Sequence, residues 1–288
     1  PALYFAGGAC TLNGVTYNPC STTGNTNQRR LFSLLRPADG GKMSAVADTD
    51  DGGTMSYNAL LLSVERRVSR GVSATANYTL SHCIGDFADL NSTGPQSDST
   101  YTNPYSRKAD HGNCDTDRRH ILNFTSVAST PTFANPKLKM IGTGWKLAVI
   151  YRRSAGQPLN ITSGVDAALS GTLNQRPNQV SEDVYTGNNG PNELYMKAAA
   201  FSAVATGAYG NLARNAFTGP RSWSFDAALS RRFQIREGQL LEFRFEAFNV
   251  TNSFRPTNPS TAISGATFGQ IRNSLDPRLM EFALKYTF

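Results

Sequence analysis

The sequence predicts an all-β fold: an antiparallel transmembrane β-barrel segment of about seven strands, with short periplasmic turns and long extracellular loops. Three observations predict this fold class. Seven stretches alternate between apolar and other residues, strictly so in the last of them; their connections alternate between long and short, and the last stretch ends on an aromatic residue. Period-two alternation is typical of a strand with one face on apolar surroundings and the other on water.

The clearest alternation lies in residues 280–288. Apolar side chains occupy every second position, while the positions between them are mostly polar or small. The last strand of a bacterial outer-membrane barrel usually has this pattern, because it closes the barrel and its terminal aromatic lies at the membrane interface. We therefore predict a terminal signal for barrel assembly in Phe282, Leu284, Tyr286 and Phe288. An ordinary half-buried edge strand is the alternative interpretation.

Six further stretches alternate in the same way. They run over residues 57–68, 72–81, 118–128, 145–152, 223–236 and 241–247. Tight turns are predicted at 69–71 and 237–238 and a medium connection at 129–144, whereas 82–117, 154–220 and 250–277 are long loops. All long connections therefore fall at one end, which is extracellular if the C-terminus is periplasmic. Residues 1–56 lack periodicity and are predicted to be an extracellular loop region, and the barrel strands and loops occupy 57–288.

Alternation also predicts which charged side chains face the barrel lumen. Lys or Arg on the lipid face at mid-membrane costs about 2–4 kcal/mol, so the register of these strands is strongly fixed. The predicted lumen-facing charged residues are Asp226, Arg232, Glu242, Arg244, Glu246 and Lys285.

Composition excludes some classes of protein. Apolar residues make up 39% of the 288 residues, and no run of 18 apolar residues could form a transmembrane helix. The net charge is +7, but the basic residues do not form runs, so we expect no nucleic-acid partner. Instead they form doublets at predicted strand ends, where arginine suits phosphate-bearing lipid head groups or a charged lumen. Solvated strand ends are the plainer alternative for these doublets: Arg66–Arg67, Arg118–Arg119, Arg152–Arg153 and Arg231–Arg232.

Four cysteines fall in two couples. Cys10 lies near Cys20 and Cys83 near Cys114, and neither couple has the spacing of a zinc site. Each couple could close a loop through a disulfide, which implies an oxidising compartment such as the periplasm or the cell surface. Free thiols are the alternative.

The search for catalytic and metal-binding patterns gives weak candidates only. Residues 110–120 hold two His, one Cys and three Asp, but no standard zinc spacing fits them. Asp48, Asp50 and Asp51 resemble the start of a calcium loop, yet Ala59 stands where an EF-hand needs Glu. Hydrolase and phosphate-loop motifs are absent from the sequence. We therefore expect no metal site, no cofactor and no enzyme activity.

Aromatic residues in the predicted outer loops are a separate candidate for binding. Tyr101, Tyr105, Tyr185, Tyr195 and Tyr209 stand near Asn and Gln, a mixture that binds sugars or peptides by stacking and hydrogen bonding. Ordinary wet extracellular loops contain the same mixture, which is the simpler interpretation.

Four stretches resemble the C-terminal barrel of TonB-dependent outer-membrane receptors, especially the Oar-like receptors of Acidobacteria and their relatives. The most specific is Phe-Asn-Val-Thr-Asn at 248–252, within the stretch 243–252. The others are 57–60 leading to 65–71, Asp-Arg-Arg-His at 117–120, and the terminal Tyr-Thr-Phe at 286–288. The resemblance extends over residues 57–288.

This resemblance implies a 22-stranded barrel, plugged by an N-terminal domain, that imports a scarce nutrient such as an oligosaccharide, a peptide or a metal chelate. It also implies a bacterial outer-membrane location and the barrel-assembly machinery, outer-membrane lipid and lipopolysaccharide as partners. The sequence departs from this pattern, because a plug, a TonB-contacting segment and a signal peptide are missing. We therefore expect the chain to be a fragment of such a receptor. The receptor would contact the TonB complex only through the N-terminal part that this sequence lacks.

Two other functions remain open at this point. The first is a non-transporting outer-membrane surface or adhesion protein that uses its long loops as a binding platform. The second is a secreted β-rich hydrolase with an unrecognised site. An upstream plug would favour transport over adhesion, and solubility without detergent would favour the hydrolase, because apolar bands and open sheet edges aggregate in water.

Overall fold

The computed structural model describes residues 2–46, 51–69, 71–86, 101–172 and 175–288. Several predictions lie partly outside these ranges. The residues concerned are 1 and 47–50 of the N-terminal loop region, which include Asp48 and Asp50 of the calcium-like run, Arg70 of the first tight turn, residues 87–100 of the loop at 82–117, and residues 173–174 of the loop at 154–220.

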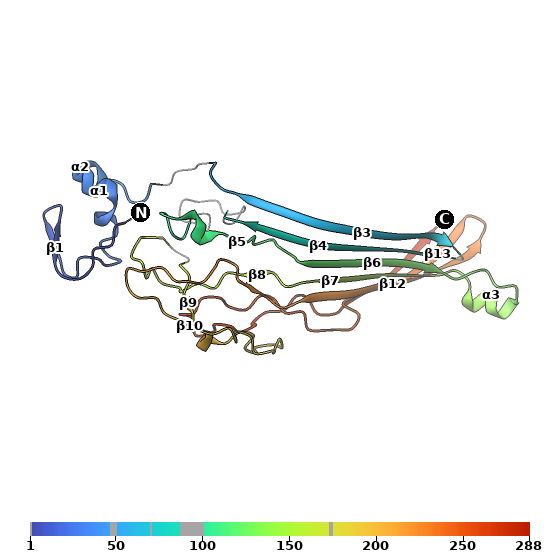
Figure 1. The fold of residues 1–288 in the computed structure, drawn as a ribbon. Helices are drawn as coiled ribbons and strands as arrows, with labels where there is room; N and C mark the ends of the chain where they lie inside the picture. The colour runs from blue at the N-terminus through green and yellow to red at the C-terminus, as the bar shows by residue number, and fades with distance from the viewer. Residues whose placement is uncertain (1, 47–50, 70, 87–100, 173–174) are drawn as a thin grey trace.

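Seven long strands form one antiparallel sheet (Figure 1), and all seven predicted strands are confirmed. In chain order they are β3 (Met55–Ser69), β4 (Val72–Gly85), β6 (His120–Ser129), β7 (Trp145–Ser154), β12 (Ser222–Arg236), β13 (Gln239–Phe248) and β14 (Leu279–Thr287). The order in the sheet is β14-β13-β12-β7-β6-β4-β3, and a short β5 (Gly112–Asn113) also pairs with β4. Among the described residues the sheet is open, with β3 and β14 at its edges, so these strands do not form a closed barrel.

Connection lengths divide the two ends of the sheet as predicted. The connections after β3, β6 and β12 lie at the end that also holds the C-terminus, while the long connections and the N-terminus lie at the other end (Figure 1). The medium connection contains a helix that the sequence reading missed, α3 (Pro136–Gly142). The Asn135 side chain caps it by accepting from the N–H groups of Lys137 and Leu138, and Pro136 suits the first turn.

The two faces of the sheet differ in chemistry, as the alternation predicts. One register row across six strands is almost wholly apolar: Val72, Ala128, Leu147, Leu229, Phe245 and Phe282. The next row, on the opposite face, contains Ser73, Val127, Ala148, Ala228, Glu246 and Glu281. Large apolar side chains of the first face remain open to the surroundings, as Phe282 at 71% and Leu284 at 69% show. A face of this kind suits lipid contact.

Beyond the sheet, at its long-connection end, residues 155–172, 175–221 and 249–278 fold together. We call these residues the loop module. Its short strands are β8 (Pro158–Leu159), β9 (Asn178–Gln179), β10 (Phe201–Ser202) and β11 (Phe217–Thr218), with a 3-10 helix η3 (Ala198–Ala200). Its core is Leu159, Ile161, Val184, Met196, Ala200, Phe201, Leu212 and Phe268. The two predicted long loops are therefore a packed unit with its own apolar core.

The described part of the N-terminal region, residues 2–46, is mostly irregular, with short elements inside it. These are β1 (Cys10–Leu12), β2 (Val15–Tyr17), η1 (Asn27–Arg29), α1 (Leu31–Leu35) and α2 (Pro37–Gly40), and η2 (Arg107–Asp110) follows in the loop after β4. None of the helices in the described ranges is long and apolar enough to cross a membrane.

Candidate functional site

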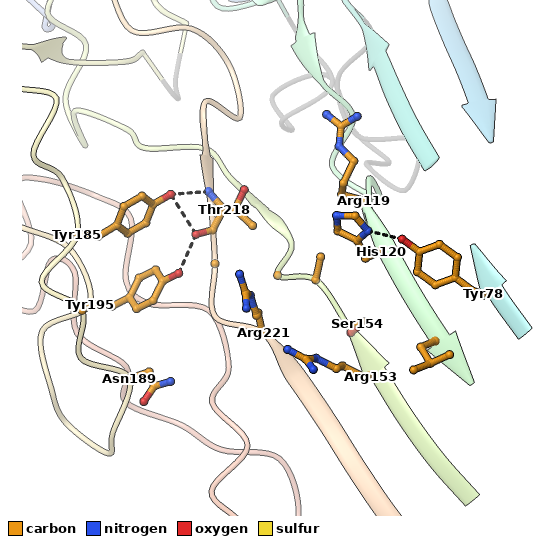
Figure 2. Close-up of a pocket in the computed structure, with 15 residues that line it drawn as sticks. Tyr78, Arg119, His120, Arg153, Ser154, Tyr185, Asn189, Tyr195, Thr218 and Arg221 are labelled. Carbon is orange, nitrogen blue, oxygen red and sulfur yellow. Dashed lines mark hydrogen bonds between the residues drawn. The ribbon is translucent and has the colours of Figure 1, made fainter. Parts of the chain in front are cut away.

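Two adjoining cavities lie where the long-connection ends of the strands meet the loop module, and Figure 2 shows the residues that line the larger one. The larger has a volume of about 720 Å³ and the smaller about 380 Å³. Arg153, Asn189 and Arg221 line both of them, so the two form one continuous site. Volumes of this size are typical of sites that enclose a small organic group.

The sheet supplies one side of the site, and four of the lining residues come from one register row. Tyr78, Leu122, Arg153 and Trp223 are direct cross-strand neighbours on β4, β6, β7 and β12. Directly paired residues project from the same face of a sheet, so these four lie at one end of the apolar face. The Tyr78 hydroxyl and His120 Nδ1 are hydrogen-bonded at 2.8 Å, and the two rings stack with centroids 6.2 Å apart.

The loop module supplies the other side through two tyrosines. The hydroxyls of Tyr185 and Tyr195 donate to the Thr218 carbonyl at 3.3 and 3.0 Å, and the Thr218 N–H donates to the Tyr185 hydroxyl at 2.9 Å. The rings meet edge to face, with centroids 5.4 Å apart. Burial, reinforced by the neighbouring Tyr185, raises the pKa of Tyr195 to about 12, and burial also raises the pKa of Tyr185. Both phenols are thus kept protonated and fixed.

The charge of the site is one-sided. Arg119, Arg153 and Arg221 line the larger cavity and Arg255 lines the smaller, while no Asp or Glu lines either cavity in the described part of the chain. The first three side chains are exposed and make no hydrogen bond or ion pair with any other described residue. Arg255 donates to the Asp276 carbonyl at 2.8 Å. The site therefore holds positive charge without a carboxylate to balance it.

A buried ion pair fixes the loops around the site. Arg176 and Asp110 approach to 2.6 Å, and their side chains are only 6% and 4% exposed. Arg176 also donates to the carbonyl oxygens of Ala109 at 2.6 Å and Leu212 at 2.9 Å. Because these partners come from the loop after β4 and from the loop module, one guanidinium joins the two.

A second contact lies beside this ion pair. The Asp115 carboxylate accepts from Arg214 at 2.7 Å and from the Asn215 amide at 2.6 Å, and that amide also donates to the Asn113 carbonyl at 2.7 Å. Hydrogen bonds to charged groups stabilise more than neutral ones. The loop after β4 and the loop module are therefore held at two points.

One comparison with known proteins gives a match. A family model described as an outer membrane beta barrel domain matches residues 7–281. The chain belongs to this family. No curated protein and no solved structure matches the chain. As an outer membrane beta barrel domain, it is a protein of the bacterial outer membrane, with its short turns on the periplasmic side and its long loops outside the cell.

The stretch Asp117–His120 of this barrel domain ties three strands together at their extracellular ends. The Asp117 carboxylate accepts from the Cys83 N–H at 2.9 Å, and Arg118 donates to the Ala155 carbonyl at 2.9 Å. The Arg118 carbonyl in turn accepts from the Ser81 hydroxyl at 2.9 Å. The stretch thus has a structural role at the ends of β4, β6 and β7.

The Phe-Asn-Val-Thr-Asn stretch turns the chain out of β13. Asn249 is 1% exposed and adopts a left-handed backbone with φ 49°. Its N–H donates to the Asp226 carboxylate at 2.9 Å, and its amide donates to the Ser253 carbonyl at 3.1 Å. Asparagine tolerates this conformation better than most residues, because its short side chain bonds to nearby backbone.

Both predicted disulfides are present, Cys10–Cys20 and Cys83–Cys114. Cys83–Cys114 joins the extracellular end of β4 to the following loop. The acidic residues around Cys114 have partners in Arg176, Arg214 and backbone N–H groups. Across the described residues, no group of three or more His, Cys, Asp or Glu side chains is placed to hold a metal ion.

The six charged residues predicted to face the lumen lie on one face of the sheet. Glu242 contacts Arg232 at 3.1 Å and Arg244 at 3.2 Å, and it stands directly opposite Lys285 on β14. Arg244 also approaches Glu246 at 3.5 Å, and Asp226 accepts from Asn249. That this face lines a lumen stays a prediction.

The proposed terminal signal and the domain division also stay predictions. Phe282, Leu284 and Tyr286 lie on the apolar face of β14, and Phe288 is 92% exposed. The first long strand begins at Met55, close to the predicted start of the barrel region at residue 57.

Sequence reasoning missed the arginine-rich cavity. Of the predicted loop tyrosines, Tyr185 and Tyr195 line it, together with one arginine from each of two predicted doublets, Arg119 and Arg153. The arginine doublets therefore carried a sequence signal for this cavity. The role of Arg221 in the cavity and the fold of the loop module could not be predicted from any local sequence pattern.

Proposed function

We propose that this chain is the C-terminal barrel portion of a TonB-dependent outer-membrane receptor of the Oar-like type. The receptor imports a scarce nutrient such as an oligosaccharide, a peptide or a metal chelate. Family membership supports the outer-membrane barrel, and the resemblance in four stretches of residues 57–288 supports the finer assignment. In this proposal the protein moves its ligand unchanged and needs no cofactor.

The observation that carries the proposal is the open sheet. The outer edges of β3 and β14 pair with no other strand among the described residues. A membrane does not tolerate open edges, because unpaired backbone N–H and C=O groups find no water in the hydrocarbon region. Closure therefore requires further strands, and a 22-stranded barrel of the receptor type would supply them. Barrel diameter grows with strand number, so such a barrel is wide enough to need a plug.

The loop module supports a role in recognising ligand from outside the cell. It packs eight buried apolar residues and is tied to the loop after β4 by Arg176, so it presents a fixed surface. A fixed surface loses little conformational entropy when a ligand binds. A non-transporting adhesion protein would use the same platform, so this feature alone does not separate the two functions.

The decisive experiment starts from the native protein, extracted with detergent from the outer membrane of its source. Its intact mass is measured, and the protein is then passed over an immobilised periplasmic domain of TonB. At about 40 residues per strand, 22 strands predict a species of roughly 900 residues, and the proposal expects that species to be retained.

Three other outcomes would contradict the proposal in different ways. A species of 31.2 kDa would contradict the large barrel. A large species that TonB does not retain would favour the non-transporting surface protein. A species that is soluble without detergent would favour the secreted hydrolase. In the proposed receptor, the barrel-assembly machinery inserts this chain, and the TonB complex contacts the N-terminal part of the receptor.

A further inference from the structure

We infer that the two adjoining cavities hold the phosphate-bearing head group of a lipid from the outer leaflet, with Arg153 and Arg221 as its main ligands. A phosphorylated glycolipid such as lipopolysaccharide is the lipid of this chemistry. The inference rests on the outer-membrane barrel and does not depend on the proposed transport function.

The height of the site on the sheet is the first argument. Arg153 and Trp223 pair at the extracellular end of the apolar face, and Trp145 lies eight residues along β7 from Arg153. Eight residues span about 26 Å of strand, or about 20 Å of height at a tilt of about 40°. The apolar band of such barrels is about 25 Å tall. With Trp145 at the inner edge of the band, the backbone of Arg153 lies within about 5 Å of the outer edge, a distance that a long arginine side chain spans to reach the head groups.

The direction of Arg153 is the second argument. It shares its face with Leu122 and Trp223, its direct neighbours on β6 and β12. Arg152, the preceding residue, pairs with Asn123 and Ser224 on the opposite face. A nutrient inside the lumen would meet Arg152, whereas a lipid outside the barrel meets Arg153.

Charge is the third argument. In Figure 2 the side chains of Arg153 and Arg221 lie between the tyrosine pair of the loop module and the Tyr78–His120 pair of the sheet. Neither arginine has a side-chain partner in the described ranges, and no carboxylate lines the cavities. Two unbalanced guanidinium groups favour an anion, and their planar donor geometry matches phosphate oxygens.

The aromatic lining fits a sugar attached to that phosphate. Tyr78, Tyr185 and Tyr195 line the larger cavity and Trp223 lines the smaller. Such rings offer flat apolar faces together with polar tips, which is why they gather at membrane interfaces. Below the site, Phe124 and Val149 continue the apolar face, and acyl chains of the same lipid would lie along it.

The test uses the native protein purified in detergent, with bound lipopolysaccharide measured as glucosamine and phosphate after extensive detergent exchange. The informative variants are Arg153→Gln and Arg221→Gln. The matched control is Arg152→Gln, which removes the adjacent charge from the opposite face. Hydrogen bonds to charged groups contribute enough for a roughly tenfold loss of retained lipid in each informative variant. The control should retain as much lipid as the wild type.

Several outcomes would overturn the inference. If both informative variants retain as much lipid as the wild type, Arg153 and Arg221 do not bind it. If Arg152→Gln loses as much lipid as the informative variants, the lipid does not bind specifically on the apolar face. Release by millimolar inorganic phosphate as readily as by added lipopolysaccharide would show a site for free phosphate.

Wild-type protein provides a check that does not depend on folding of the variants. Lipid is first removed, and the tryptophan fluorescence is followed while vesicles are added. Vesicles that contain lipopolysaccharide should change the fluorescence and protect the loop module from chymotrypsin, whereas vesicles of phosphatidylcholine alone should do neither. An equal response to both vesicles would also overturn the inference.

Discussion

Arg153 on β7 stands directly opposite Trp223 on β12, and eight positions further along the same two strands the pairing is repeated in reverse, with Trp145 on β7 opposite Arg231 on β12. The Arg231 guanidinium lies 5.1 Å from the centre of the Trp145 ring, within the range of a cation–π contact. On these two strands, each rim of the apolar face thus carries a tryptophan paired with an arginine. Interfacial aromatics and arginines of this kind fix the height of a membrane protein.

Two adjacent alanines test the assignment of the two faces. Ala227 pairs with Val149 and Ala247 on the apolar face, whereas Ala228 pairs with Ala148 and Glu246 on the other. Ala227→Arg should destabilise the inserted barrel by about 2–4 kcal/mol, because it places a charge in lipid near mid-membrane. Ala228→Arg should cost no more than about 1 kcal/mol if its face is wet. Urea unfolding of the native protein in lipid measures both, and equal costs would contradict the assignment.

Arg176→Met should loosen the loop module by about 3–5 kcal/mol, because it leaves the buried Asp110 carboxylate without its partner. Lys197→Met is the matched control, since its ion pair with Asp183 is largely exposed and should contribute less than about 1 kcal/mol. Amide hydrogen exchange of residues 155–221 gives the local free energies. Similar exchange in the two variants would show that Arg176 does not hold the module.

Asn249 allows backbone strain to be separated from hydrogen bonding. Asn249→Ala loses the amide hydrogen bonds and keeps a side chain at φ 49°, so we expect a cost of about 2–4 kcal/mol. Asn249→Gly loses the same hydrogen bonds, but glycine adopts the left-handed backbone conformation without strain. Its loss of unfolding free energy should therefore be about 1 kcal/mol smaller than that of Asn249→Ala. Thermal unfolding compares the two. If Gly is no better than Ala, the backbone conformation contributes little.

The two disulfides should differ in their contribution to stability. Loop-closure entropy predicts roughly 4 kcal/mol for Cys83–Cys114, which spans 31 residues, and roughly 3 kcal/mol for Cys10–Cys20, which spans 10. Serine pairs in place of each disulfide, compared by thermal unfolding with and without reductant, measure the difference. Reductant should have no further effect on a protein that lacks both bridges.

Alkaline pH should reduce the stability of the folded protein in a window that the pKa of Tyr195 defines. The pKa of Tyr195 is raised to about 12 in the folded protein, while an unfolded tyrosine titrates near 10. The stabilisation of the folded protein that is linked to the protonated Tyr195 is therefore complete below pH 10 and is lost as the pH rises through 12. Tyrosinate absorbance against pH follows the titration, and Tyr195→Phe should remove the late step. A late step that persists in this variant would assign it to another tyrosine.

The strands were predictable because lipid and water impose a period of two along each of them. That rule acts locally, so Met280 to Phe288 reveal their strand without knowledge of any partner. Alternating connection lengths then gave the direction of each strand. Both disulfide couples followed from proximity in sequence.

The loop module was not predictable because its contacts are distant in the sequence. Arg176 and Asp110 are 66 residues apart, and Phe268 packs into a core otherwise built from residues 159–212. No periodicity in the sequence indicates such contacts. The helix at 136–142 did carry a local signal, because Asn135 followed by Pro136 is a common helix start.

The chain order of the strands in the sheet has a consequence for how the barrel forms. From β3 to β14, each long strand pairs with the next long strand along the chain. The sheet can therefore form by adding one neighbouring strand at a time. The closing seam of a barrel is different, because it joins a first and a last strand that are distant in the sequence. Contacts between distant parts of a chain form slowly. We therefore expect the closing seam of the barrel that contains these strands to form last and to open first.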